Sequence, residues 1–153
     1  MSHARTKIRE AIKTLLDGTG SWTAVFTTRV SSPRAIWPYL MVYADGEPIE
    51  QVSVTSGVYE RSATFAIMAM LRVPGNGDKQ TIEDKIDDIC AEIESKITVP
   101  RLTSILSGSV RAEFTGTAMT VVVDEEDKVS HAEATLSLTV KYFTAEGKPE
   151  TML

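Results

Sequence analysis

Cysteine is nearly absent from this sequence of 153 residues, and its scarcity restricts the cellular compartments and the types of fold that are possible. The one cysteine, Cys90, has no partner in the chain, so a secreted scaffold held by internal disulfides is excluded. Lysine and arginine are spread over residues 1–14, which leaves no apolar stretch of the kind that a signal peptide needs. We therefore expect synthesis in a reducing cytoplasm.

Long apolar runs and a basic excess are missing too. The longest apolar run, Phe65 to Leu71, has the length of a strand and is far shorter than the roughly 20 residues that cross a bilayer. The net charge of −5 argues against a broad basic face that would grip nucleic acid. With 42% apolar and 24% charged residues, the composition predicts one globular domain over residues 1–153.

The residues that carry most enzyme chemistry are also scarce. His3 and His131 are the only histidines, and each is expected on solvated surface without the partners that a catalytic base requires. The acidic residues between Asp84 and Glu94 surround a predicted helix and do not converge on a cation. No glycine-rich phosphate loop is present. We expect no enzyme activity, no cofactor and no metal.

Two segments have the periodicity of amphipathic helices. The first follows Ser2, a possible N-cap, and ends before Gly18. The second follows the break at residues 74–77, with an approximate capping box of Thr81 and Asp84, and ends at Pro100. Their apolar stripes are Ala4, Ile8, Ala11, Ile12, Leu15 and Leu16 in the first and Ile82, Ile86, Ile89, Ile93 and Ile97 in the second.

The remaining regular segments have the composition of strands. They are Trp22 to Val30, Tyr39 to Tyr43, Arg61 to Val73, and two strands, 110–124 and 131–143, joined by a charged turn. The fold class predicted is α+β: a mixed, mostly antiparallel sheet in a single domain, two helices packed on one face, and a long C-terminal hairpin. The segment from Gly46 to Tyr59 is expected to form a hairpin or a mobile arm, and residues 145–153 are expected to be loose.

The strand from Arg61 to Val73 is apolar on both faces. Helices can cover one face, so the other needs more chain or a neighbouring subunit, and we favour the neighbour.

The order of these segments resembles a known family. TKIREAIKTLL, VFTTRV, WPYLMVY, IEDKIDDICAEIESKI and LSLTVKYF follow one another from about Arg5 to Phe143 as in the tail terminators of long-tailed bacteriophages, which include the minor tail protein U of lambda-type phages. The present chain is longer around Ile49 to Tyr59 and after Phe143.

The resemblance implies a structural protein that forms a homo-oligomeric ring, a hexamer, on the tail tube. Such a ring stops tube polymerisation and offers a face for head joining. The partners implied are the tail tube protein and a head-completion or connector protein, with DNA passing through unbound. The location implied is the head-proximal end of the virion tail, reached after assembly in the host cytoplasm.

Other classes stay open. A head–tail connector or neck protein and a contractile-tail assembly protein share small size, acidity and ring assembly, whereas a small ligand-binding α/β domain needs converging polar side chains. For a subunit or tail-tube interface, the candidate contact residues are Ile49, Val52, Val54, Val58, Tyr59, Arg61, Arg72, Asp124, Glu125, Glu126 and Asp127.

Overall fold

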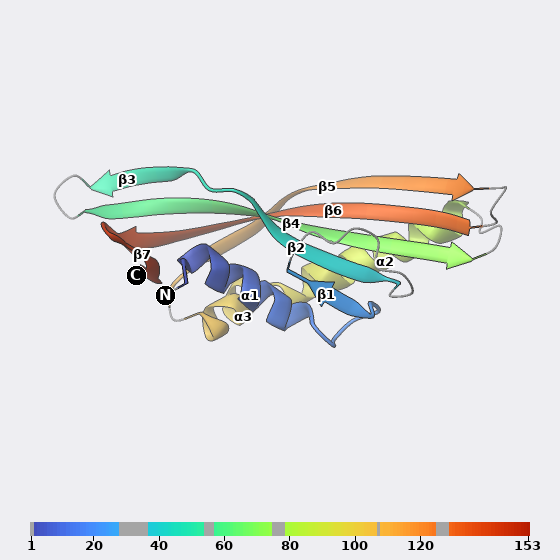
Figure 1. The fold of residues 1–153 in the computed structure, drawn as a ribbon, viewed down its shortest axis with the longest axis horizontal. Helices are drawn as coiled ribbons and strands as arrows, with labels where there is room; N and C mark the ends of the chain where they lie inside the picture. Colours follow the sequence, from blue (N-terminus) through green and yellow to red (C-terminus); the bar gives the residue numbers. More distant parts are fainter. Residues whose placement is uncertain (1, 28–36, 54–56, 75–78, 107, 125–128) are drawn as a thin grey trace.

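The computed structural model describes residues 2–27, 37–53, 57–74, 79–106, 108–124 and 129–153, which form three helices and seven strands (Figure 1). The helices are α1 (Ala4–Leu16), α2 (Lys79–Lys96) and α3 (Val99–Ile105). The strands are β1 (Ala24–Phe26), β2 (Tyr39–Gly46), β3 (Ile49–Ser53), β4 (Val58–Pro74), β5 (Arg111–Asp124), β6 (Val129–Ala145) and β7 (Lys148–Met152). None of the described helices has the length and apolar character needed to cross a membrane.

All seven strands belong to one sheet. Its main order is β1-β2-β4-β6-β5, while β3 pairs with β4 and β7 pairs with β6. Only β1 and β2 are parallel, so the sheet is mixed and mostly antiparallel, as predicted. The expected C-terminal hairpin is β5–β6, which pairs from Arg111 opposite Lys141 to Asp124 opposite Val129 with a register shift between Phe114 and Gly116. The α+β fold class is therefore confirmed.

The helices and one face of the sheet enclose a single hydrophobic core. The five isoleucines of the α2 stripe are buried, with exposures between 0% and 5%. They pack in one cluster with the buried face of α1 and with Phe65, Ile67, Leu136 and Leu138 of the two central strands. Cys90 lies in the same cluster as a small buried side chain. The 3.6-residue periodicity of the helices and the alternation of the strands thus predicted the core correctly.

Helix α1 begins differently from the expectation. His3, rather than Ser2, is the N-cap, and its Nδ1 accepts the backbone N–H of Arg5 at 3.0 Å. An imidazole nitrogen satisfies the same unpaired helix N–H that a serine hydroxyl would. Gly18 follows the helix with φ +68°, a backbone conformation that favours glycine.

The prediction of two helices was wrong, because α3 is a third. Helix α2 already ends at Lys96, so Pro100 does not end it and instead lies in the first turn of α3. Proline is tolerated there because an N–H in the first turn has no intrahelical acceptor. Likewise α2 begins at Lys79, before the expected capping box. Leu102 is fully buried and fixes α3 in the core.

Several strand limits also differ. Strand β1 covers Ala24–Phe26 within the longer segment expected, while residues 28–30 lie outside the described part of the chain. Trp22 is buried before the strand, and its indole N–H donates to the Leu16 carbonyl at 2.7 Å. Strands β2 and β4 each extend beyond the expected limits.

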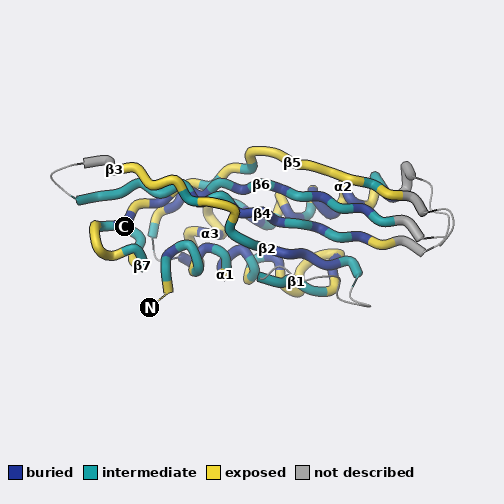
Figure 2. Tube along the Cα trace, turned by 45° about the horizontal axis from the view of Figure 1, so that its top comes forward, coloured by how far each residue is buried: buried dark blue, intermediate teal, exposed yellow. Residues whose placement is uncertain are grey.

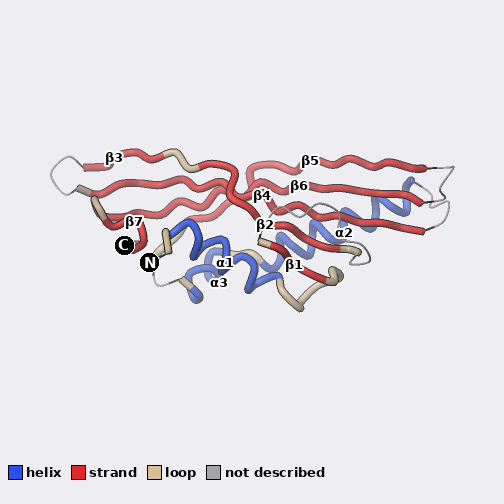
Figure 3. Tube along the Cα trace, in the orientation of Figure 1, coloured by secondary structure: helices blue, strands red, loops and turns tan. Residues whose placement is uncertain are grey.

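The two segments expected to be loose both contain strands. The arm forms the hairpin alternative, since β3 pairs with β4, and this hairpin projects past the helices (Figure 3). The C-terminal segment contains β7, whose Met152 packs against the core. Because β5 begins opposite Lys141, the last residues of β6 have an open edge, and β7 pairs there.

Candidate assembly interface

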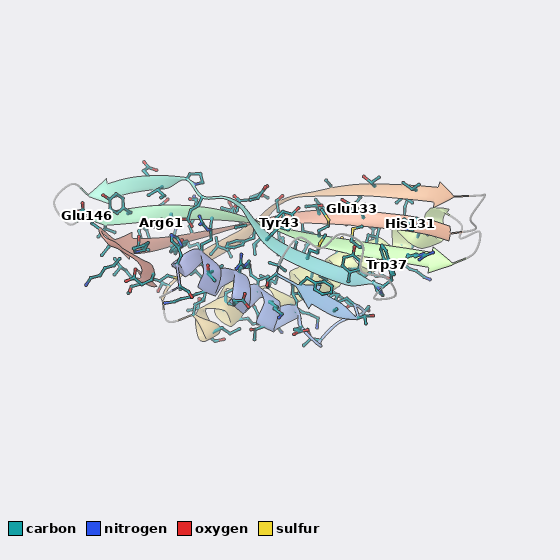
Figure 4. The ribbon with its side chains drawn as sticks, in the orientation of Figure 1. Trp37, Tyr43, Arg61, His131, Glu133 and Glu146 are labelled. Atoms are coloured by element: carbon teal, nitrogen blue, oxygen red, sulfur yellow. The ribbon has the colours of Figure 1, made fainter. Side chains whose placement is uncertain are left out.

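The sheet face turned away from the helices carries a band of methionine and aromatic side chains. Across β2 and β4, Met41 is opposite Met68 and Tyr39 is opposite Met70. Tyr39 and Met41 are 2% and 7% exposed, and the other two are half-buried. Trp37 packs on Tyr39 with ring centroids 5.0 Å apart and lies on this face near His131 (Figure 4). Methionine-rich apolar surface adapts readily to a partner.

Polar groups border the same band. His131 is 6.0 Å from Trp37 between ring centroids, and Glu133 lies opposite Met70 on β6. Burial, followed by the charge of Glu133, raises the pKa of Tyr39. The band therefore has an apolar centre and a polar edge, with Tyr39 and Met41 at its centre already buried within the subunit.

A buried ionic network holds the base of the β3–β4 hairpin. Glu47, in the connection between β2 and β3, has a side chain that is only 2% exposed. Its carboxylate accepts Arg61 Nη1 at 3.0 Å and the Tyr142 hydroxyl, and Arg5 and His3 lie at 3.8 Å. Buried carboxylates are tolerated when cations and hydrogen bonds surround them in this way.

The network joins four parts of the chain. His3 and Arg5 come from the start of α1, Arg61 from β4 and Tyr142 from β6. Arg61 also donates from Nε to Thr144 Oγ1 at 2.8 Å. Burial, together with the hydrogen bond and charge of Glu47, raises the pKa of Tyr142 well above its usual range. The hairpin base is therefore fixed to the body of the subunit.

A smaller polar contact ties α2 to the segment before β1. The hydroxyl and the backbone N–H of Ser21 both donate to the carboxylate of Glu92, the latter at 2.9 Å. The hydroxyl hydrogen bond lowers the pKa of Glu92. Within the described part of the chain, no three His, Cys, Asp or Glu side chains gather as metal ligands.

Strand β5 forms a long exposed edge. Among the described strands it pairs with β6 alone, and Figure 2 shows it exposed along most of its length. From Phe114 to Val122 it carries neither charge nor proline. Met119 is 48% exposed and Val122 is 53% exposed. Natural sheets usually protect such edges with lysine, proline or covering chain, so this edge is suited to pairing with another chain.

The structure separates the candidate contact residues into different environments. Ile49 is 54% exposed on β3 and Arg72 is exposed on β4, whereas Val58 and Tyr59 are half-buried. Arg61 is engaged inside its own subunit with Glu47. Val52 lies in β3 and Asp124 ends β5. Val54, Glu125, Glu126 and Asp127 lie outside the described residues.

Sequence reasoning missed the buried network and the uncharged edge. Glu47 stands in a turn beside Pro48, where a carboxylate usually meets solvent, and its partners are 14 to 95 residues away. No local pattern indicates such contacts. The edge did leave a signal in the sequence, because an uncharged run of nine residues, Phe114 to Val122, is unusual in the outermost strand of a sheet.

Comparison with known proteins adds little. No family model and no curated protein matches the sequence. Among solved structures, the chain is similar to one from a "Virion of native gene transfer agent (GTA) particle", with 14% sequence identity and a TM-score of 0.48. The similarity covers 91% of this chain and 95% of that one.

Proposed function

We propose that this protein is a structural component of a bacteriophage virion, a tail terminator that forms a ring at the end of the tail tube. The observation that carries the proposal is the β5 edge, which exposes an uncharged run from Phe114 to Val122. A chain with such an edge tends to add strands from other chains. In a closed ring every such edge is paired with a neighbouring subunit, so no edge remains to add further chains.

Other features support the same role. On the sheet face turned away from the helices, the half-buried Met68 and Met70 offer a small apolar surface to a neighbouring subunit or to the tube. The projecting β3–β4 hairpin, fixed through Glu47, offers a second contact element. The net charge of −5 lets DNA pass through a ring without being held along a basic face. The order of elements resembles that of tail terminators, which supports the tail position and the hexamer.

The proposal is tested by solution mass and by tube growth. Light scattering over a range of protein concentrations, followed by negative-stain imaging, detects a ring; six copies of the 16.7 kDa subunit give about 100 kDa. The purified protein is also added to polymerising tail tubes. We expect either a ring in isolation or a ring formed on tube ends, and in both cases tubes that stop growing.

Tubes taken from finished virions are the matched control, since their head-proximal ends are already occupied and should not bind the protein. A strict monomer that leaves tube growth unchanged contradicts the proposal. A neck or connector protein gives a different result, namely binding to filled heads with no effect on tube length.

A further inference from the structure

Two pairs of like charges face each other across neighbouring strands. Glu50 of β3 is directly opposite Glu60 of β4, and Arg111 of β5 is directly opposite Lys141 of β6. Like charges in directly opposite positions destabilise a sheet. Glu50 thus lies at the β3 edge and Arg111 at the β5 edge, each beside a like charge on the next strand, while Glu60 and Lys141 lie diagonally across the adjacent strands β4 and β6.

All four charges lie on the face turned away from the helices. Cross-strand partners share a face, and alternate residues along a strand do as well. Glu60 is opposite Phe143, and Lys141 is two residues before Phe143 on β6. Tyr142, between them, is fully buried on the helix side. The open face therefore carries Glu50 and Glu60 toward β3, and toward β5 it carries Arg111 and Lys141 with one acidic neighbour, Glu113.

These charges are accessible. Glu50, Arg111 and Lys141 are exposed and Glu60 is half-buried, and none of the four forms a salt bridge or a side-chain hydrogen bond with another described residue. A hollow of about 390 Å³ lies beside the basic pair. Glu60, Arg111, Lys141 and the 37% exposed ring of Phe143 are among the residues that line it.

We propose that the basic pair Arg111 and Lys141 of one subunit binds the acidic pair Glu50 and Glu60 of a second copy of this chain. The contact rests on the proposed ring and identifies its subunit boundary as β5 against β3. Opposite signs at opposite edges make the association head-to-tail, which is the arrangement that closes into a ring and not into a two-fold dimer. Charge pairs of this kind fix register and exclude wrong partners.

The strand directions fit this contact. The pairs β3–β4, β4–β6 and β6–β5 are each antiparallel, so β3 and β5 run in opposite directions. A second copy placed beside the first in the same orientation therefore adds its β3 to β5 as an antiparallel neighbour. With Glu50 opposite Arg111, β3 would pair with the start of β5, and the uncharged run from Phe114 to Val122 would lie beyond Ile49, the first residue of β3.

Charge reversal tests the boundary with two full-length variants. The basic-edge variant carries Arg111→Glu and Lys141→Glu, and the acidic-edge variant carries Glu50→Lys and Glu60→Lys. Each alone juxtaposes like charges at every boundary, so we expect its dissociation constant for assembly to rise about tenfold or more. An equimolar mixture should assemble again, with the two variants alternating, because the reversed edges are complementary. Light scattering and tube capping provide the readouts.

The matched control is Asp87→Lys with Glu94→Lys on the exposed surface of α2, which changes net charge by the same amount as the acidic-edge variant. It should assemble like the wild type. A mixture that assembles no better than either variant overturns the boundary, as does a variant that assembles like the wild type. If the wild type forms no ring, alone or on tubes, both the ring and the boundary are wrong; if it forms one that the reversals leave unchanged, only the boundary is.

Discussion

Replacement of Glu47 by alanine gives a sharp test of how the hairpin is held. The side chain is 2% exposed and contacts Arg61, Tyr142, Arg5 and His3. Its removal leaves Arg61, whose side chain is 12% exposed, without its nearest anion. The hydroxyl of the fully buried Tyr142 loses its acceptor in the same step.

Removal of one partner from a buried ion pair typically costs about 3–5 kcal/mol. Arg61 keeps its hydrogen bond to Thr144 and a 3.5 Å contact with His3 Nε2, and Arg5 is partly solvated with a side chain 41% exposed. We therefore expect the lower end, about 3 kcal/mol for Glu47→Ala. In a domain of this size that corresponds to a fall of roughly 6–12 °C in Tm. Glu47→Gln retains an acceptor for Tyr142 and should cost less, about 2 kcal/mol.

Urea unfolding followed by circular dichroism measures both variants. Glu10→Ala is the control, because Glu10 forms an exposed ion pair with Arg9 at 4.0 Å and should change the free energy of unfolding by less than about 0.5 kcal/mol. If Glu47→Ala costs no more than this control, the network does not stabilise the hairpin and the reasoning is refuted.

Three further predictions concern other groups. Burial lowers the pKa of His3 below 6.5, so the unfolded chain binds more protons near and below pH 6.5; the stability from neutral His3 is complete above that pH and is lost as pH falls through the folded pKa. His3→Asn, which retains an N-cap, should make the urea midpoint depend less on pH between pH 7 and 5. An unchanged pH dependence of the midpoint contradicts this. Burial raises the pKa of Cys90 to about 11, so iodoacetamide at pH 8 should modify the folded protein over a hundredfold more slowly than the unfolded chain; equal rates would show an accessible thiol. Ala118→Lys with Thr120→Lys should reduce self-association while changing the free energy of unfolding by less than about 0.5 kcal/mol, and light scattering that shows undiminished association would exclude the β5 edge.

The parts of the fold that depend on local periodicity could be predicted. The isoleucine stripe of α2 and the alternation of β6 each record, within a few neighbouring residues, which face is buried. The long hairpin then makes β5 and β6 neighbours, but it does not place β4 beside β6. Helix α3 could not be predicted with the same ease, because its seven residues contain Pro100 and only Leu102 is buried. A proline can mark either the start of one helix or the end of another, and the local sequence around Pro100 does not distinguish these two roles.

The C-terminal segment shows a different limit of prediction from sequence. Strand β7 has little alternation of its own, and it forms because β6 extends past the start of β5 and leaves an edge open. The backbone N–H of Leu153 donates to the Phe143 carbonyl at 2.9 Å, and Lys7 Nζ donates to the Glu150 carbonyl at 2.7 Å. These contacts depend on relative strand lengths, which are a property of the whole sheet. The same holds for Glu47, whose partners meet only after α1, β4 and β6 have packed.

The buried network and the proposed subunit boundary are connected through one short segment. Glu47 is followed after Pro48 by Ile49 and Glu50, so the carboxylate that is fixed by Arg61 lies three residues before the acidic side chain proposed to meet a neighbour. A strand that must pair with another chain loses conformational entropy when it does so, and the loss is smaller if its base is already held. Burial of the Glu47 charge costs free energy, and the entropy saved by ordering the hairpin before assembly offsets part of that cost. If the proposed ring forms, the stability of the subunit and the affinity of its assembly both depend on the Glu47 carboxylate.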